Sequence, residues 1–600
     1  MKTIKKLIIY SFILCTNLAY GDFEKTKFVR GEILVKFKNG VSQTSKIKAL
    51  RANGASNIQS YDKLRINHVK IPEGKDLFKA IDDLARNPDV EFAQPNYIYR
   101  ALRLPNDPSF SQSWGMRNTA QTIVVASGGD TPSSTNNPGV SGKDMSLANA
   151  WDVITDCSTV LVAVVDSGVN YNHQDLTGNM WNGGASYPYY GYDFVDNDNN
   201  PMDKDGHGTH VAGIIGSTGN NSVGTSGVCW KSKIMAVRVL DAVGSGLTSQ
   251  IIAGINFAVS QGAKIINLSL GMETYDAALS ASIDNARTNG VLIVAAAGND
   301  SRNLEGGTSM YPCAFTQDNV LCVAGLDQAY SLATYSNYGS TSVDVGAPGT
   351  NILSDWNGSY STLLTDPLTS GWTNSTLTGS SWGYKSINFN TARNCLVYPS
   401  NYDYSAARYL NSSDSKIWKN FNLGTGDGFI LKFNVMYDYE QDYDGVILYS
   451  KSTGGDPVTG SVLDAFTGTT SGYSIPVSYD VSQLASSTTS FGFRSITDNT
   501  NNDFGINVSN LAVRKLTISN TLYNVISGTS MATPHVTGLA ALLLAYNQNY
   551  SYLDLIEAIK AGAISTPSLV GKTTVGKAVN AQGAISYIQQ VKNVTGAQQP

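Results

Sequence analysis

Between about residue 150 and residue 350, hydrophobic positions form short unbroken runs separated by longer stretches of small and polar residues. Val160–Val165 and Val291–Ala297 are such runs, and Lys233–Val239 is a further strand candidate. A strand that is apolar at nearly every position is typical of a parallel sheet covered on both faces. Because the runs alternate with small-residue helical stretches as far as Gly349, the pattern predicts an α/β domain built on a parallel sheet.

From about Trp356 to Thr521 the hydrophobic pattern changes. Apolar and polar residues alternate in short segments, such as Gly428–Val435 and Gly445–Ser450, and Tyr, Ser, Thr, Asn and Gly are abundant between them. Alternation with closely spaced turn residues is typical of an all-β sandwich. This segment therefore interrupts the α/β domain as an insertion about one domain long.

Residues 26–100 have a third pattern. Gly31–Phe37, His68–Ile71 and a final apolar segment from Val90 are predicted strands, and Asp76–Arg86 is a predicted helix. The order strand, strand, helix, strand predicts a small α+β unit ahead of the larger domain.

The first 21 residues differ from all of these segments. Lysines in Met1–Lys6 precede the apolar stretch Leu7–Leu14, and Ala19–Gly21 offers small residues for cleavage. This is the pattern of a secretory signal peptide, and the apolar stretch is too short to span a bilayer. A lipoprotein signal through Cys15 is the alternative, although the preceding Ile13-Leu14 lacks the usual small residues. We expect an exported, extracellular protein with no membrane span.

Composition adds two limits. A chain of 600 residues exceeds what one core usually covers, so several domains are expected. The net charge of -5 and the charged fraction of 15% give no indication of nucleic-acid binding.

The strongest chemical candidate lies in Gly528–His535, where Ser530 stands at a glycine-flanked turn before the apolar helix Val536–Ala545. One interpretation is a helix cap, because serine and threonine oxygens satisfy free N–H groups there. The other is a nucleophile, which needs a base and an orienting acid from elsewhere in the chain.

Candidates for both partners are present. His207 has a glycine on either side, which leaves its imidazole open, whereas His210 is expected to pack inside. Asp166 ends the apolar run that begins at Val160, and the carboxyl end of a buried parallel strand is where active-site residues gather.

These segments resemble the three signature blocks of the subtilisin-like serine proteases, in the order Asp, His, Ser. The resemblance implies that Ser530 attacks the scissile carbonyl, that His207 transfers the proton, and that Asp166 orients the imidazole. Asn299, at the end of another apolar strand, matches the oxyanion-hole block of the same family. A turn residue is the alternative for Asn299.

The resemblance also implies where peptide binds. An edge formed by Ser269, Leu270 and Gly271 is expected to hold an extended polypeptide, so protein or peptide substrates are implied. A side-chain pocket is expected between this edge and Ala296, Ala297 and Gly298, with Met310 at its base. We predict a preference for mid-sized apolar residues before the cut.

Five cysteines remain after the signal peptide, which is an odd number for an oxidising compartment. Cys313 and Cys322 flank a short loop and are a candidate pair. Cys157 and Cys229 each precede a strand, and the family places these strands side by side, so they form the second candidate pair. Cys395 is left over.

Two acidic loops are candidates for structural Ca²⁺, which prefers six to eight oxygen ligands. The first combines Asp175 with Asn221, Val223 and Thr225, and it resembles the family's high-affinity site. The second is the oxygen-rich loop with Asp193, Asp196, Asp198 and Asn200, which resembles the calcium loop of thermitase-type subtilases. A solvated turn is the alternative for the second loop.

The N-terminal α+β unit resembles the inhibitor propeptide of the family, so the chain's own propeptide is an expected intramolecular inhibitor, with cleavage between Tyr97 and Pro105. An independent accessory domain is the alternative. The predicted organisation is a signal peptide at 1–21, a propeptide at 22–102, a catalytic domain at 103–355 and 522–600, and a β-sandwich at 356–521.

The inserted sandwich loosely resembles jelly-roll modules of other secreted peptidases. It is a candidate for binding carbohydrate or protein, for gating substrate access, or for stability alone. The leading prediction for the whole chain is a secreted serine endopeptidase made as a zymogen. A binding protein on a subtilase scaffold and a non-peptidase hydrolase are the other candidates.

Overall fold

The computed structural model describes residues 28–98, 103–126, 136–388, 392–401, 409–500 and 503–595. The predicted signal peptide and Cys15 lie outside these residues. The chain divides into two compact units at Leu102/Arg103, and each unit is described by itself. No helix of the described residues is long and apolar enough to cross a membrane.

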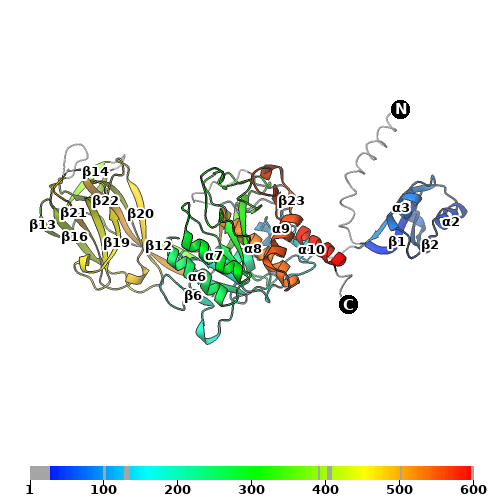
Figure 1. The fold of residues 1–600 in the computed structure, drawn as a ribbon, viewed down its shortest axis with the longest axis horizontal. Coiled ribbons are helices and arrows are strands. Elements are labelled where there is room, and N and C mark those ends of the chain that lie inside the picture. The colour runs from blue at the N-terminus through cyan, green and yellow to red at the C-terminus, as the bar shows by residue number, and fades with distance from the viewer. Residues whose placement is uncertain are drawn as a thin grey trace, which may run out of the picture. The chain divides into compact units, whose positions relative to one another are not determined.

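The N-terminal unit is a four-stranded antiparallel sheet with two helices (Figure 1). The strands follow the order β2-β3-β1-β4, and inward-facing Ile33, Val35 and Phe37 of β1 are fully buried. The elements are β1 (Phe28–Phe37), α2 (Gln43–Ala52), β2 (Ser56–Tyr61), β3 (Ile66–Lys70), α3 (Leu77–Ala85) and β4 (Val90–Tyr97). The sequence analysis missed α2 and β2, because β2 is polar and exposed throughout and lacks an apolar alternation.

The larger unit contains the predicted parallel sheet. Nine strands follow the order β23-β24-β11-β10-β9-β8-β5-β7-β6, and every pair is parallel except β23 with β24. The strands are β5 (Val162–Asp166), β6 (Gly191–Asp193), β7 (Ile234–Arg238), β8 (Ile265–Leu268), β9 (Leu292–Ala296), β10 (Val320–Leu326), β11 (Val345–Pro348), β23 (Ile564–Ser565) and β24 (Lys577–Ala578).

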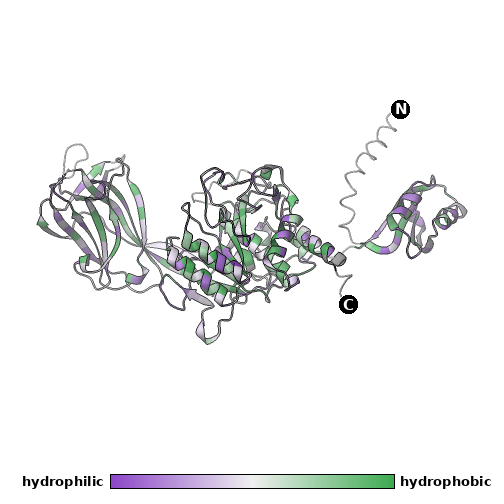
Figure 2. Ribbon diagram, viewed as in Figure 1, coloured by the Kyte–Doolittle hydropathy of each residue, from purple (hydrophilic) through white to green (hydrophobic). Residues whose placement is uncertain are grey.

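Helices cover both faces of this sheet, as the apolar runs predict. Val162 and Val164 of β5 pack into one hydrophobic cluster with α5 and α8, whereas Ala163 and Val165 pack into another with α6 and α7. The strands and helices of this domain carry many hydrophobic positions (Figure 2). The helices are α4 (Leu147–Ala150), α5 (His207–Gly216), α6 (Thr248–Ser260), α7 (Ala277–Thr288), α8 (Thr529–Tyr546), α9 (Tyr552–Gly562) and α10 (Ala581–Thr595).

Residues between β11 and α8 form a β-sandwich. One antiparallel sheet follows the order β14-β15-β22-β17-β20 and the other β13-β16-β21-β18-β19, and their facing residues share one aromatic-rich core. The strands are β13 (Thr373–Thr378), β14 (Gly383–Asn388), β15 (Ala392–Tyr398), β16 (Asp414–Phe421), β17 (Phe429–Asp438), β18 (Gly445–Lys451), β19 (Ser461–Phe466), β20 (Ile475–Asp480) and β21 (Thr489–Ile496).

Two long strands connect the sandwich to the parallel sheet. β12 (Ile352–Thr365) and β22 (Gly505–Ile526) pair as an antiparallel ribbon that begins beside α5 and continues into the sandwich (Figure 1). Trp356 faces Leu522 in this ribbon. The predicted limits of the insertion therefore fall at facing positions of a continuous ribbon rather than in a loop.

Two disulfides are present in the larger unit. Cys157 pairs with Cys229 and Cys313 with Cys322, at Cα–Cα distances of 5.9 and 5.1 Å. These are the two pairs expected from the sequence. Cys395 lies buried in β15 with a free thiol, and burial raises its pKa to about 11.

Candidate active site

Asp166 ends β5, the strand between β7 and β8. Its side chain is fully buried, and its Oδ1 lies 2.7 Å from His207 Nδ1 and accepts a hydrogen bond from Ser167 N at 2.7 Å. Its Oδ2 has no hydrogen-bond partner among the described residues. The structure therefore holds a buried carboxylate against one nitrogen of the imidazole, which leaves the other nitrogen for a different partner.

A tight turn before α5 presents His207. Gly206 has a φ of +120°, and a Cβ there would lie 2.5 Å from the Trp356 ring, so only glycine fits. Asp203 organises the turn, because its carboxylate accepts hydrogen bonds from the amides of Asp205, Gly206 and Thr209. Asp203 ends the oxygen-rich loop that was a candidate for calcium, and its part in this turn was not predicted, although its place just before the Gly-His-Gly segment was a usable signal.

The electrostatic setting of His207 favours the charged imidazole. Burial disfavours the charge, but the carboxylate of Asp166, supported by Asp205 and Asp203, outweighs it and raises the pKa of His207 to about 9. The side chain keeps a quarter of its surface exposed. It is thus both accessible and strongly coupled to its acid.

Ser530 is the second residue of α8, as the turn before the apolar helix predicts. Its Oγ donates a hydrogen bond to the carbonyl of Ser269 at 3.1 Å, and Ser269 Oγ donates to the carbonyl of Ser530 at 2.9 Å. Among the hydrogen bonds of the described residues, none joins Ser530 to His207. A hydroxyl turns by rotation about χ1 alone, and such bonds commonly tighten only when substrate binds.

Asn299 follows β9 on an exposed turn. Its Oδ1 accepts hydrogen bonds from Thr529 N at 2.9 Å and from Thr529 Oγ1 at 3.0 Å. These bonds fix the orientation of the amide, so its NH₂ group remains available as a donor. Because Thr529 immediately precedes Ser530, the donor and the hydroxyl are linked through one residue.

A cleft of about 640 Å³ lies beside His207. The predicted peptide edge lines one side through Ser269, Leu270 and Gly271, and the chain continues along the cleft at Met272. The other side was missed by the sequence analysis and is formed by Leu240, Gly244, Ser245, Gly246, Leu247 and Thr248. The glycines after β7 were a usable signal, since loops at the carboxyl ends of parallel strands commonly bind ligands.

The predicted pocket residues lie behind this edge. A Cβ added to Gly271 would lie 3.0 Å from Met310 Sδ, and one added to Gly298 would lie 2.9 Å from Met310 Cε. Met310 therefore packs between the two backbone segments. Ala296 and Ala297 are buried and complete the second segment.

The first predicted calcium loop surrounds Asp175. This fully buried carboxylate accepts hydrogen bonds from Asn221 Nδ2 at 2.8 Å, from Thr225 N at 3.1 Å and from Tyr523 Oη at 2.8 Å. Asn221 Oδ1 in turn accepts from Val223 N at 2.8 Å. The structure thus brings the four predicted residues together, and burial raises the pKa of Asp175.

The second predicted calcium loop has a different electrostatic balance. Asp193 and Asp196 both form ion pairs with the buried Arg238, at 2.6 and 2.9 Å, and Asp196 also pairs with Lys204. The two other predicted ligands take part in local hydrogen bonds, with Asp198 accepting from the amide of Asn200 and Asn200 from Tyr171. Arg238 and Lys204 therefore already balance the charges of Asp193 and Asp196, two of the four predicted ligands.

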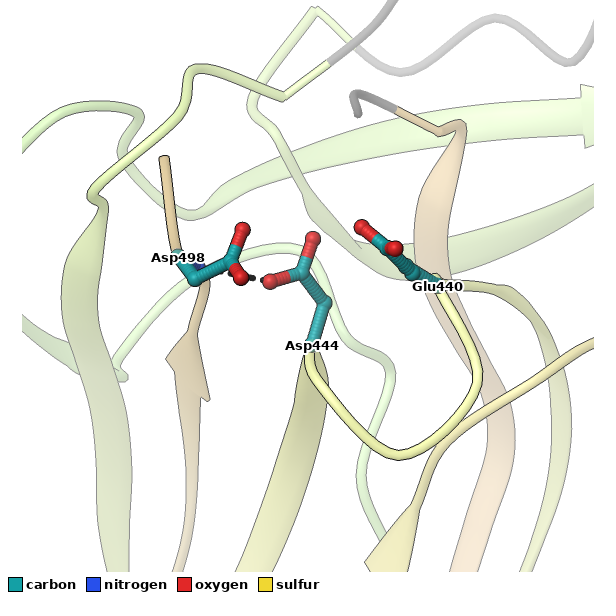
Figure 3. A group of neighbouring side chains, drawn as sticks. All are labelled: Glu440, Asp444 and Asp498. Carbon is teal, nitrogen blue, oxygen red and sulfur yellow. Dashed lines mark hydrogen bonds between the residues drawn. The ribbon is translucent and has the colours of Figure 1, made fainter. Parts of the chain in front are cut away.

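A third acidic group lies in the sandwich, where the carboxylates of Glu440, Asp444 and Asp498 are neighbours (Figure 3). Asp444 accepts hydrogen bonds from Asp498 N at 2.7 Å and from Tyr409 Oη at 2.5 Å. Its two oxygens are thus both engaged in holding loops of the sandwich together.

Comparison with known proteins agrees with this geometry. The model of the subtilase family matches residues 158–382 and 436–584, more than half of the chain. The chain belongs to the subtilase family. It is a subtilisin-like serine endopeptidase, and the interruption of the family match at 383–435 falls within the sandwich.

Two curated relatives show how far the similarity extends. The subtilase is 37% identical over 334 residues to the thermophilic serine proteinase of Bacillus sp. (strain AK1), covering 55% of this chain and 72% of the relative. It is 42% identical over 207 residues to thermitase of Thermoactinomyces vulgaris, covering 34% of this chain and 68% of the relative.

The N-terminal unit of the subtilase also has a match. Residues 17–96 match the fervidolysin N-terminal prodomain. The α+β unit of β1 to β4 is therefore a prodomain, and the enzyme is made as a zymogen.

Proposed function

We propose that this subtilase is a secreted endopeptidase that cleaves extended polypeptides through Asp166, His207 and Ser530. The observation that carries the assignment is the 2.7 Å contact between the buried Asp166 and His207, on strands and helices that also bring Ser530 and Asn299 to the same edge of the sheet. The two disulfides and the extracellular naming of a relative, the halolysin-like extracellular serine protease of Natrialba magadii, support secretion.

In the proposed reaction, Ser530 Oγ rotates from the Ser269 carbonyl toward His207 Nε2, loses its proton to that nitrogen and attacks the scissile carbonyl. The imidazole then carries a positive charge, which Asp166 stabilises. Asn299 Nδ2 donates to the oxyanion of the tetrahedral intermediate. His207 returns the proton to the leaving amine, an acyl-enzyme forms on Ser530, and water releases it by the same steps in reverse.

A fluorophosphonate probe tests the proposal on the processed, full-length enzyme. The probe is expected to modify Ser530, and the label should be absent from Ser530→Ala and much reduced in His207→Phe. Mass spectrometry of the labelled peptide locates the modification. A correctly processed enzyme that stays unlabelled would refute the proposal and favour a binding role.

Met310 is proposed to set the preference before the cut. Its side chain lies between Gly271 and Gly298, so it narrows the space that a substrate side chain would enter. Mid-sized apolar side chains are expected there. In a peptide series that varies only this residue, Met310→Gly should shift the kcat/KM ratio toward large aromatic residues, and a wild-type preference for Lys, Arg or Glu would contradict the assignment.

The Asp175 loop is the better fit for Ca²⁺. Asp107 and Asp175 are both buried, Asp107 lowers the tendency of Asp175 to ionise, and neither has a Lys or Arg ion-pair partner among the described residues. A divalent cation held by Asp175, Asn221 and the carbonyls of Val223 and Thr225 would balance this charge. The Asn221 amide would have to turn its oxygen inward.

Bound Ca²⁺ would act by stabilising the native state, by about 2.7 kcal/mol at a concentration a hundredfold above Kd. Chelation should therefore lower the Tm of the wild type, and it should have little effect on Asp175→Asn. Asp198→Asn is the matched variant for the second loop, where Arg238 and Lys204 already supply positive charge. A Tm that chelation leaves unchanged in the wild type would remove both calcium assignments.

A further inference from the structure

One wall of the substrate cleft contacts the inserted sandwich. This wall, residues 240–248, follows β7 and folds back on itself, with Asp241 N donating to the Ser245 carbonyl at 2.7 Å. Asp241 Oδ1 accepts from the amides of Val243 and Ser245 at 2.9 and 3.0 Å. These local bonds shape the turn, and its two ends are tied to the catalytic domain by Leu240 N, which donates to the Asp166 carbonyl at 3.2 Å, and by Thr248 Oγ1, which donates to Asp276 Oδ2 at 2.7 Å.

Asp480 supplies an attachment. It is the last residue of β20 in the sandwich, and its Oδ2 accepts a hydrogen bond from Ala242 N at 3.0 Å. Its other oxygen accepts from the amide of Ser482 at 2.9 Å, within the sandwich. One carboxylate therefore joins the sandwich to the base of the cleft wall, across 238 positions of sequence.

The same carboxylate also reaches a buried charge beneath the wall. Arg238 at the end of β7 is fully buried, and its Nη2 lies 3.5 Å from Asp480 Oδ2. Its Nη1 pairs with Asp193 and Asp196. The wall thus starts from a guanidinium shared by three carboxylates, one of which comes from the sandwich and is only 11% exposed.

We propose that Asp480 is a positioning residue through which the sandwich fixes wall 240–248 and so sets the affinity for extended polypeptide. The inference rests on the proposed endopeptidase function. An extended chain in the cleft makes contacts on both sides, with Ser269–Gly271 and with the wall. Without Asp480, the segment of the wall around Ala242 loses its support between the two tied ends. Ordering this segment at each binding event costs free energy, which weakens binding without touching Ser530 or His207.

Loss of binding that is equal in the ground state and the transition state raises KM and leaves kcat unchanged. For Asp480→Ala in the processed full-length enzyme, KM for a six-residue peptide should rise about tenfold, as expected for one charge-assisted hydrogen bond. The kcat should stay within about twofold. A single-residue ester, which does not reach the wall, should be hydrolysed as by the wild type.

Two variants control this experiment. Asp480→Asn keeps an oxygen that accepts from Ala242 N and should recover most of the affinity. Asp456→Ala removes a sandwich carboxylate of similar kind, one that pairs with Lys416 and makes no contact with the wall, and its KM should match that of the wild type.

The outcomes separate the two proposals. A wild type that cleaves neither substrate refutes the endopeptidase function itself. If the wild type cleaves both and Asp480→Ala keeps the wild-type KM for the peptide, the positioning role is wrong. An equal loss of kcat on peptide and ester also overturns it, because that result indicates general damage to the fold.

Hydrogen exchange gives a test that needs no variant. In the wild type, the Ala242 amide should exchange slowly although it lies in a loop, because its proton is held by Asp480. Exchange of Ala242 at the rate of an exposed loop amide would overturn the inference.

Discussion

Two histidines one turn apart in helix α5 have opposite electrostatic settings. His207 begins the helix beside the cleft, and acidic neighbours raise its pKa to about 9. His210, one turn later, contacts the ribbon that leads to the sandwich, and burial lowers its pKa to about 3. The same side chain therefore favours the charged form at one position and the neutral form at the other, and the difference comes from what each imidazole contacts.

The contacts explain the contrast. His207 Nδ1 meets the buried carboxylate of Asp166, whereas His210 Nε2 meets the carbonyls of Ile352 and Asn524 at 3.0 and 3.2 Å. A carboxylate stabilises imidazolium strongly, and a carbonyl only accepts one N–H from a neutral ring. Substitutions among the contacts of His207, here called the cleft face, should therefore affect rate. Substitutions among the contacts of His210, here called the ribbon face, should affect stability.

The largest expected effect is that of Asp166→Asn on the cleft face. The amide leaves the shape intact but favours the wrong imidazole tautomer, so kcat should fall about 10⁴-fold. Steady-state kinetics on a peptide substrate measure the loss, with the surface variant Asp156→Asn as a control that should retain full activity. A fall of less than tenfold would mean that His207 does not depend on Asp166.

Asn299→Ala should have the next largest effect. The amide held by Thr529 donates only to the developing oxyanion, so its loss should lower kcat about a hundredfold to a thousandfold with little change in KM. Thr529→Val removes only the hydroxyl that orients Asn299 and should cost much less. An Asn299→Ala enzyme that loses affinity instead of rate would assign Asn299 to substrate binding.

The pH profile measures the cleft face directly. In the proposed reaction, His207 accepts the proton of Ser530 only when its imidazole is neutral. The kcat/KM should therefore be low at neutral pH, rise with increasing pH and level off above about 9. Because the raised pKa keeps the imidazole largely protonated at pH 7, activity there should be well below its maximum. A profile that levels off near pH 6.5 would show that Asp166, Asp205 and Asp203 leave the imidazole unperturbed.

Stability should change in the opposite direction over the same range. Because the pKa of His207 is higher in the folded state than the ordinary 6.5, its contribution to stability is complete below about 6.5 and is lost as pH rises through about 9. Between pH 6.5 and 9, activity should therefore rise while the contribution of His207 to the free energy of unfolding falls. The two measurements on one sample test the same pKa by independent routes.

The four side chains proposed for catalysis each have a local signal in the sequence. Asp166 and Asn299 end apolar strands, and His207 and Ser530 stand at glycine turns that open helices. The parallel sheet was predictable for the same reason, since its strands are unbroken apolar runs. In the prodomain, β2 was not, because its exposed residues leave no pattern to detect.

The contacts between the sandwich and the sheet leave no such signal. Asp480 is one of many acidic residues, and nothing near it in sequence indicates that it meets Ala242, 238 positions away. Likewise, the spacing of Asp193 and Asp196 indicated a calcium loop. The ion pairs that these carboxylates form with Arg238 could not be predicted, because Arg238 lies outside that loop and is brought to it by the pairing of β6 with β7. Pairings of this kind depend on tertiary packing rather than on composition.

The smallest effect on rate is expected from the ribbon face, and it completes the comparison between the two histidines. His210→Phe keeps an aromatic ring in a fully buried site but leaves the carbonyls of Ile352 and Asn524 without a donor, which should cost about 1–3 kcal/mol in the free energy of unfolding. Its kcat should stay within a few fold of the wild type. His207→Phe, the matched change one turn earlier, should abolish activity. Above about pH 9, where the wild-type imidazole is neutral, it should lose little stability because its site is partly open to the cleft. Denaturant unfolding and kinetics on both variants measure the contrast. If His210→Phe lost as much activity as His207→Phe while remaining folded, the ribbon face would belong to the active site after all, and the division of α5 into two roles would fail.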